Sequence, residues 1–219
     1  MFMISARQHH VHRRALTDDR LSAIQRLRYE VYCLERKFRD AAEYPDGLER
    51  DEYDAHSTHI CATDATGAVV GTVRLVHHTP LGLPVQQHGA TLAVSADELE
   101  RRKTAEVSRL ILAKEYRRHT LDQPLLLWGL FARAYEESCR LGIGYWVAAM
   151  EEGLWRLLRR FGFPIDPIGE AIDYFGPVIP YGIVVSELAD GYRNFRSLQV
   201  ATAGGRPEIA GKFELTVAA

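Results

Sequence analysis

The stretch AEVSRLILA, residues 105–113, has the composition of a β-strand that carries two charged side chains. Aliphatic residues recur at nearly every position, which indicates a largely buried strand. Glu106 and Arg109 fall on opposite faces of such a strand unless a bulge intervenes. Because an isolated buried charge is costly, both side chains need partners from other parts of the chain.

The flanking segments alternate between helical and strand periodicity. The predicted elements are, in chain order, a helix at 16–32 capped by Thr17, a hairpin at 58–78 that turns at DATG, a short helix at 94–103 with a capping box, the strand at 105–113, a helix at 122–142, a strand at 143–150, a helix at 151–162 and a strand at 181–188. This order predicts an α/β protein with one mixed central sheet flanked by helices. We expect a polar lead-in over residues 1–15, a single domain over 16–198 and a tail over 199–219.

Composition excludes several classes of function. The formal net charge is −2, so no global charge favours nucleic acid or an anionic membrane. The three cysteines show no CxxC pair, which argues against a disulfide framework or a structural zinc site. No apolar run approaches the ~20 residues that span a bilayer, and the first residues lack the apolar core of a secretion signal. We expect a cytoplasmic protein without an integral membrane segment.

An acidic stretch precedes the hairpin. GLERDEYDAHSTHI, residues 47–60, holds four carboxylates. Arg28 lies near the edge of the buried face of the first helix, and Arg74 lies in the middle of an apolar strand of the hairpin. Arginine pairs well with carboxylates when both are buried. Carboxylates of this stretch and the arginines can therefore converge at one end of the sheet. The alternative is a set of structural or surface ion pairs without catalysis.

The segments LRYEVY (27–32), GLERDEYDAHSTHI, GTVRLV (71–76) and AEVSRLIL (105–112) together resemble a known family. Their order is similar to that in acyl-homoserine-lactone (autoinducer) synthases and their relatives, the N-acyl amino acid synthases and exosortase-associated acyltransferases. The resemblance covers about residues 20–190. It implies the GCN5-related N-acyltransferase fold and an acyl-carrier-protein-dependent acyltransferase.

The resemblance also implies the site residues. The positions that form an electrostatic cluster beside the acyl-transfer site fall on Arg28, Asp51, Asp54, Arg74, Glu106 and Arg109. We therefore expect Asp51 and Asp54 to point inward toward the arginines, and Glu49 and Glu52 to be solvated. Autoinducer synthases carry aromatic residues before the acidic stretch and before the E-SR segment, where this chain offers Phe38 or Tyr44 and Ala105. This departure favours acylation of an amino acid or similar small amine. The alternatives are an acyl-homoserine-lactone synthase that uses S-adenosylmethionine, a non-catalytic module that binds acyl-carrier protein, and a coenzyme A-dependent acetyltransferase.

The donor is expected to be an acyl group on the phosphopantetheine of acyl-carrier protein, with no cofactor bound. Coenzyme A users of this fold cradle the pyrophosphate in a glycine-rich turn, but AKEYRRHTLDQP at 113–124 has no glycine. An acidic carrier protein needs a basic surface. The candidates are Arg117, Arg118, Arg156, Arg159 and Arg160, although such runs are more often solvated helix faces.

The expected reaction is direct attack of an amine on a thioester. Glu106 is the predicted base, with Asp51 as the alternative. The oxyanion would be held by backbone N–H groups near Leu110, Ile111 and Leu112, while Arg74 and Arg109 orient the acceptor's carboxylate or the acidic side chains. No cysteine has the setting of a nucleophile.

Apolar side chains of the later helix and strand are candidates to line the acyl chain: Leu126, Trp128, Phe131 and Trp146. Each of them also suits a plain core. The histidines at 9–12, and His56 with His59, have spacings that a metal can use, but the family resembled uses none, so we predict no metal site.

Overall fold

The computed structural model describes residues 11–15, 17–77, 79–117, 122–160, 162–190 and 192, with the side chains of residues 122–125 and 160 left aside. Its helical elements are α1 Asp18–Tyr29, the π-helix η1 Glu30–Glu35, η2 Ala41–Glu43, η3 Asp54–His56, α2 Pro84–Gln87, α3 Ala96–Arg101, η4 Lys114–Tyr116, α4 Asp122–Leu141, α5 Glu152–Arg160 and η5 Val185–Leu188. Its strands are β1 Val11–Arg14, β2 Ser57–Thr63, β3 Val69–Val76, β4 Thr104–Leu112, β5 Tyr145–Met150, β6 Asp166–Pro167, β7 Ile172–Asp173 and β8 Pro177–Val184.

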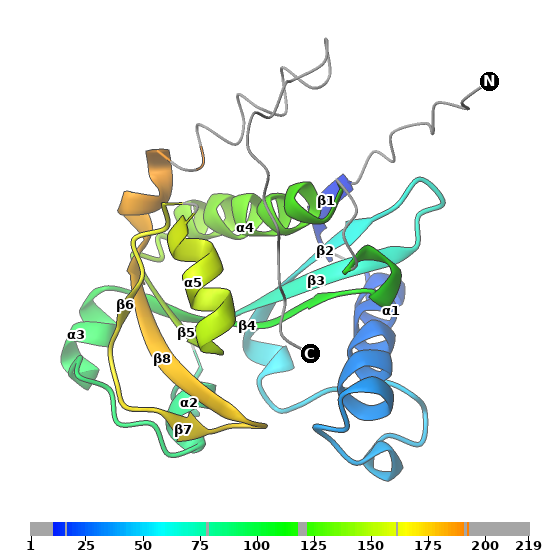
Figure 1. Ribbon diagram of the computed structural model, residues 1–219, viewed down its shortest axis with the longest axis horizontal. Coiled ribbons are helices and arrows are strands. Elements are labelled where there is room, and N and C mark those ends of the chain that lie inside the picture. The colour runs from blue at the N-terminus through cyan, green and yellow to red at the C-terminus, as the bar shows by residue number, and fades with distance from the viewer. Residues whose placement is uncertain are drawn as a thin grey trace.

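The strands form one mixed sheet in the order β1-β2-β3-β4-β5-β8-β6, with β7 beside β8 (Figure 1). Among the described strands β4 and β5 form the one parallel pair, and the other pairings are antiparallel. The fold class predicted from the sequence, a mixed α/β sheet flanked by helices, is confirmed.

Helix ends follow the local sequence signals. Thr17 accepts a hydrogen bond from the backbone of α1, and Ser95 caps α3 in the same way. Gly142 and Gly162 adopt left-handed backbone conformations with φ of 69° and 80° just after α4 and α5, where glycine pays no Cβ penalty.

The N-terminal segment differs from the prediction in one respect. Residues 11–14, expected to lie in a polar lead-in, form strand β1, which pairs with β2 from Val11↔Thr63 to Arg14↔Ile60. Backbone hydrogen bonds suffice to add an edge strand, so the polar side chains of VHRR gave no signal of it. The C-terminal tail lies outside the described residues.

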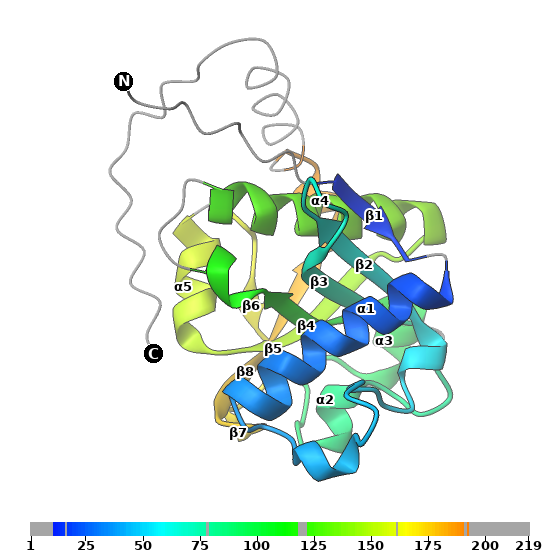
Figure 2. The same cartoon turned by 90° about the vertical axis from the view of Figure 1, so that its right-hand side faces the viewer.

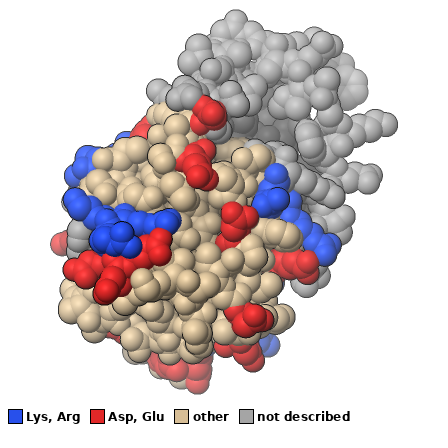
Figure 3. All heavy atoms as spheres, turned by 90° about the vertical axis from the view of Figure 1, so that its left-hand side faces the viewer, with Lys and Arg blue, Asp and Glu red and all other residues tan. Residues whose placement is uncertain are grey.

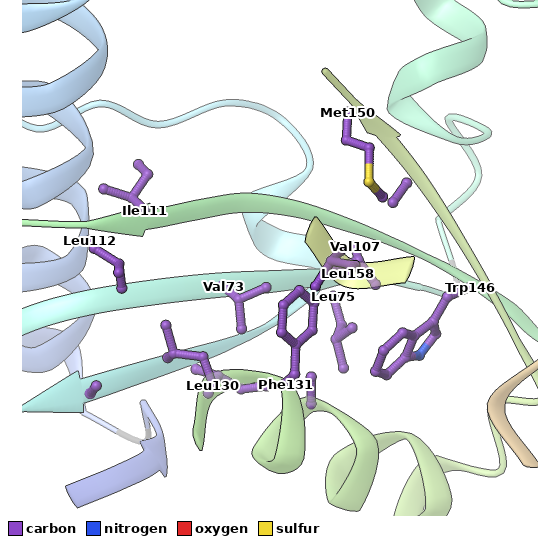
Figure 4. Close-up of a cluster of buried hydrophobic side chains, with 14 of the residues drawn as sticks. Val73, Leu75, Val107, Ile111, Leu112, Leu130, Phe131, Trp146, Met150 and Leu158 are labelled. Carbon is purple, nitrogen blue, oxygen red and sulfur yellow. The ribbon is translucent and has the colours of Figure 1, made fainter. Parts of the chain in front are cut away.

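Helices α1 and α4 lie on opposite faces of the sheet (Figure 2). Val73 and Leu75 of β3 point toward Leu130 and Phe131 of α4, where the apolar core is thickest (Figure 4). Strand alternation therefore turns Arg74, between them, toward the face that α1 covers. This separation gives the sheet a polar face and an apolar face.

Strands β4 and β5 pair over a short length and then diverge. Their register runs from Thr104↔Tyr145 to Glu106↔Val147 and stops there. Beyond this point β5 leads away toward Met150 while β4 continues beside β3 (Figure 4). Val107 and Leu158 lie near this divergence, within the main apolar core.

Candidate active site

Three arginines and three carboxylates form a closed ring of ion pairs on the α1 face of the sheet. Charges alternate in sign around it, so the ring is electrically balanced. The pairs are, in order, Arg28–Glu49, Glu49–Arg109 at 2.9 Å, Arg109–Asp51 at 2.8 Å, Asp51–Arg74 at 2.5 Å, Arg74–Asp54 at 2.6 Å and Asp54–Arg28 at 2.9 Å. The sequence prediction named five of these six residues.

The missing sixth residue is Glu49, and the prediction that it is solvated is wrong. Glu49 has 0% of its surface exposed and lies between the guanidinium groups of Arg28 and Arg109. Asp51 and Asp54 alone would balance the charges of two arginines. Arg109 brings a third positive charge to this face, and Glu49 is the third carboxylate that balances it. Glu52, predicted to be solvated, is exposed.

A β-bulge brings Arg109 to the ring. Arg74 faces Ser108 and Thr72 faces Ile111 across the β3–β4 pair, so β4 has one more residue than β3 between these points. Arg109 sits in this bulge with a φ of 53°, in the left-handed region that a side chain rarely adopts. The bulge reverses the alternation, so Arg109 lies on the same face as Glu106 and Ser108.

Tyr32 covers the Arg109 guanidinium from the side of α1. The ring centroid lies 5.3 Å from the guanidinium carbon, a cation–π distance. Tyr32 belongs to η1, where the helix widens to π geometry, which is frequent at functional sites. The sequence prediction missed Tyr32, although LRYEVY was among the stretches that carried the family resemblance.

The acidic stretch is shaped by its own backbone. The Glu49 N–H donates to the carbonyl of Gln25 on α1 at 3.1 Å, which fixes the stretch against the helix. The Asp51 carboxylate accepts from the Tyr53 N–H at 3.1 Å, and the buried Tyr53 ring anchors the turn into η3. Asp54, the first residue of η3, then faces Arg28 and Arg74.

The carboxylates of the ring are held in their charged form. Burial alone would raise the pKa of Asp51, but the hydrogen bond from Arg74 and the charge of Arg109 lower it to about 2. The same balance of burial against arginine charges lowers the pKa values of Glu49 and Asp54. These three groups are therefore poor proton acceptors at neutral pH.

Glu106 differs from the ring carboxylates in its surroundings. Its side chain is 1% exposed, and no arginine forms an ion pair with it among the described residues. Its Oε2 accepts the Val85 N–H of α2 at 2.8 Å. Burial raises the pKa of Glu106 to about 7, despite the opposing effects of that hydrogen bond and of Arg74. Glu106 can therefore gain or lose a proton near neutral pH, as a general base must.

Two guanidinium nitrogens of the ring have no hydrogen-bond acceptor. Nη2 of Arg28 and Nη2 of Arg74 are buried and unpartnered within the described part of the chain. Buried donors are nearly always satisfied in native proteins, so these two can take a water or an oxygen of a bound molecule.

Aromatic side chains from three loops cover the outer side of the ring. The Tyr174 ring stacks on His88 at 3.7 Å, and Phe175 stacks on Phe38 at 5.7 Å. Burial raises the pKa of Tyr174, which also senses the charges of Arg109 and Glu106. This aromatic cover joins the segment after η1, the segment after α2 and the β7–β8 turn. The sequence showed no sign of the contribution from the β7–β8 turn.

A pocket lies between α4, the segment after α5, and η5. Aromatic side chains dominate its lining, including three of the predicted acyl-chain residues, Trp128, Phe131 and Trp146. Its empty space, with the open mouth included, is about 390 Å³. Leu126, the fourth predicted residue, is fully buried in the core and does not line this pocket.

Three of the five predicted basic residues are described, and each is paired with an acidic neighbour. Arg117 forms an ion pair with Glu35 at 2.5 Å, Arg156 with Glu152 at 2.7 Å, and Arg159 with Asp166 at 3.4 Å. Arg118 and the side chain of Arg160 lie outside the described residues. Lys and Arg gather in separate groups beside Asp or Glu on the face shown in Figure 3, with uncharged surface between them. Arg156 and Arg159 remain half-exposed or more on α5.

The described histidine candidates, His12, His56 and His59, belong to no cluster that could hold a metal ion. Within the described residues no group of three or more His, Cys, Asp or Glu side chains has the geometry to hold a metal ion. His59 instead has Nε2 3.2 Å from the carbonyl oxygen of Asp54, and burial lowers its pKa. Histidines 9 and 10 lie outside the described residues.

Comparison with known proteins agrees with this architecture. Residues 27–128 match the family model described as an acetyltransferase (GNAT) domain. The sheet, with its diverging β4 and β5, matches solved structures of N-acyl-transferring enzymes over most of the chain. The fold is the GCN5-related N-acyltransferase fold.

Three solved structures illustrate the likeness. BjaI, a CoA-dependent acyl-homoserine lactone synthase, is 21% identical and aligns with a TM-score of 0.65 over 86% of this chain and 90% of its own. LasI, an acyl-homoserine lactone synthase, is 18% identical with a TM-score of 0.65 over 81% and 91%. FeeM, an N-acyl amino acid synthase from uncultured soil microbes, is 19% identical with a TM-score of 0.62 over 91% and 98%.

No curated protein matches the sequence. The domain match and the structural neighbours support the prediction of an acyltransferase. At identities this low the neighbours establish the fold of this chain. Within the described residues no helix combines the length and apolar character needed to cross a bilayer.

Proposed function

We propose that this protein transfers a fatty acyl group from acyl-carrier protein to the amine of an amino acid or a similar small amine. The observation that carries the proposal is the contrast between Glu106 and the ring. Three carboxylates are locked in the charged form by arginines, while Glu106, on the same face, has a pKa raised to about 7. Groups with separated pKa values in one site indicate a division between structural and proton-transferring roles.

The two faces of the sheet supply the two substrate sites. The amine occupies the polar face, between Glu106, the ring and the aromatic cover. The acyl chain occupies the apolar face, in the pocket lined by Trp128, Phe131 and Trp146. The thioester carbon lies in the divergence of β4 and β5, where β4 has no neighbour from β5 beyond Glu106.

The chemistry needs one proton acceptor and one oxyanion site. Glu106 takes a proton from the ammonium group, and the free amine attacks the thioester carbonyl. The oxyanion of the tetrahedral intermediate is stabilised by backbone N–H groups of the β4 bulge at Leu110–Leu112. On collapse the C–S bond breaks, the proton still in excess on the attacking nitrogen passes to the phosphopantetheine sulfur, and an amide and a free thiol remain. Nη2 of Arg74, which has no hydrogen-bond acceptor among the described residues, binds the acceptor's carboxylate in this proposal.

The carrier-protein assignment is supported by the lack of a glycine-rich turn after β4 and by the exposed arginines of α5. The nearest rival is an acyl-homoserine lactone synthase. The similarity to BjaI and LasI supports this rival to the same degree as the similarity to FeeM supports an N-acyl amino acid synthase. Phe38 or Tyr44 takes the place of the aromatic residue before the acidic stretch, but Ala105 stands before Glu106, where autoinducer synthases carry an aromatic. This departure favours the N-acyl amino acid synthase.

Mass spectrometry of reaction products separates these functions. The protein is incubated with acyl-carrier protein or coenzyme A loaded with C8 to C16 chains, pooled amino acids, and S-adenosylmethionine present or absent. N-acyl amino acids that form without S-adenosylmethionine support the proposal. Acyl-homoserine lactone as the product, which requires S-adenosylmethionine, would replace it with the rival. Faster turnover of acyl-coenzyme A than of acyl-carrier protein would reject acyl-carrier protein as the donor.

A further inference from the structure

A tyrosine outside the site described above contributes to the lining of the apolar pocket. Tyr192 follows η5 and lines the pocket together with Leu188 and Tyr135. Its ring centroid lies 4.8 Å from that of Tyr135. Its hydroxyl donates to Oε1 of Glu136 at 2.6 Å. Tyr192 is therefore attached to α4 by a ring contact and a short hydrogen bond to a carboxylate.

The acceptor of that hydrogen bond is itself held in place. Oε2 of Glu136 accepts from Arg133, one turn earlier on α4, at 2.9 Å. Arg133 also pairs with Glu137, which is 2% exposed and binds Arg140. The carboxylate that receives Tyr192 therefore belongs to an ion-pair network along one side of α4.

Tyr192 contacts the part of the pocket lining around Tyr135, which lies away from the proposed thioester site. Pocket residues recur along α4 from Trp128 to Tyr135, a rise of about 10 Å at ~1.5 Å per residue. The Tyr135 end of α4 adjoins the start of β5, because Leu141 and Tyr145 are separated by a short turn. There β5 is still paired with β4, whereas the thioester site lies where the two strands have diverged.

We propose that Tyr192 is a specificity-determining residue whose ring closes the far end of the pocket and sets the longest acyl chain that the protein accepts. This inference rests on the proposed function, because it takes the pocket as the acyl site. A chain longer than the pocket meets the Tyr192 ring, which cannot move without losing the Tyr135 contact and the Glu136 hydrogen bond.

Acyl-donor chain length tests the inference in the full-length protein. Initial rates are measured with C8, C10, C12, C14 and C16 donors for the wild type, Tyr192→Ala and Tyr192→Phe. Tyr192→Ala should extend the upper length limit by at least two carbons, with little change for the shorter donors. Tyr192→Phe keeps the ring and should keep the wild-type limit. An upper limit unchanged in Tyr192→Ala would overturn the inference.

A binding measurement separates this inference from the proposed function. Free fatty acids of the same lengths are titrated against tryptophan fluorescence, because Trp128 and Trp146 line the pocket. Longer acids should bind Tyr192→Ala at least fivefold more tightly than wild type, with equal affinity for the shorter ones. Tighter binding of the longer acids to Tyr192→Ala, with no turnover of any donor, would support Tyr192 as the residue that limits chain length and would reject acyl transfer. Turnover with no length shift in either assay would keep acyl transfer and reject the inference.

Stability is checked by thermal unfolding of each variant. If Tyr192→Ala is unfolded, Tyr192→Leu replaces it, since leucine keeps an apolar plug of smaller volume. The same upward shift in chain length is then expected, and an unchanged limit is again the contradicting result.

Discussion

Glu49 and Arg109, 60 positions apart in the chain, meet at 2.9 Å in an ion pair that solvent barely reaches. This contact closes the ring of six charges, because Glu49 also binds Arg28 and Arg109 also binds Asp51. A buried ring of this kind is weak evidence for stability, since desolvation offsets much of the attraction. It does fix the geometry of the polar face, against which the acceptor amine and Glu106 are placed.

Removing one carboxylate from the ring should be costly. Glu49→Gln leaves Arg28 and Arg109 with one negative charge fewer, so the free energy of unfolding should fall by about 3–5 kcal/mol. Glu52→Gln, three residues away and exposed, is the matched control and should change it by less than ~0.5 kcal/mol. Urea unfolding measures both variants. Equal effects of the two substitutions would contradict the buried position of Glu49.

Replacement of the proposed base should reduce chemistry without unfolding the protein. Glu106→Gln keeps the shape of the side chain and can still accept the Val85 N–H through its amide oxygen. It should lower kcat by roughly 10²-fold or more, with a smaller change in KM. Rates are measured by thiol release from the acyl donor. A folded variant with near-normal kcat would remove Glu106 from this role and leave Asp51 as the candidate.

The pH dependence of the rate should report on Glu106. Since its pKa is about 7, it is protonated and inactive as a base below that pH, so kcat/KM should rise as pH increases through 7. The ring carboxylates cannot produce this inflection, because the arginines lower their pKa values. In Glu106→Gln the residual rate should lack the inflection near 7. An inflection near pH 7 that persists in Glu106→Gln would show that another group causes it.

The raised pKa of Glu106 also affects stability, which should fall as pH rises, whereas the rate should increase. A carboxyl group whose pKa is raised on folding stabilises the protein below its unfolded value and loses that contribution as pH rises through the folded value. Wild type should therefore lose stability relative to Glu106→Gln between about pH 4.5 and 8, by ~3 kcal/mol from the shift to about 7. Thermal or urea unfolding at both pH values measures the difference. A constant difference would mean that Glu106 has an ordinary pKa.

Carrier-protein recognition can be tested on α5. Charge reversal of Arg156 and Arg159 to glutamate should raise KM for acyl-carrier protein at least tenfold and leave kcat for a small acyl-pantetheine thioester unchanged. Glu152→Gln, on the same helix, removes a negative charge and is the control, expected to lower KM or leave it unchanged. Equal losses with both donors would show that α5 does not recognise the carrier.

The sequence predicted most of the fold because each element carries its own local signal. Thr17, Ser95, Gly142 and Gly162 mark helix ends, and the hairpin around DATG has strand periodicity on both sides. Strand β1 lacked such a signal, since edge pairing depends on the backbone of β2. The divergence of β4 and β5 is a property of the assembled sheet and was not predicted.

The site was predicted less completely, and Arg109 shows the reason. Regular alternation on β4 places its side chain on the face opposite Glu106, where it would not need Glu49. The bulge that turns it is a local backbone feature with a φ of 53° at a non-glycine residue, which residue types do not reveal. Contacts between distant segments, such as Val85 to Glu106 and Tyr174 to His88, likewise form only when these segments fold together.

The most direct test of the central claim is a stoichiometric one. Acyl-carrier protein carrying a single chain length within the accepted range is mixed with the protein and ¹⁵N-labelled amino acids, and thiol release and N-acyl product are measured together. We predict one labelled N-acyl amino acid per thiol released, with S-adenosylmethionine absent, and a loss of both signals in Glu106→Gln. Thiol release that yields free fatty acid, or no release at all, would contradict acyl transfer to an amine.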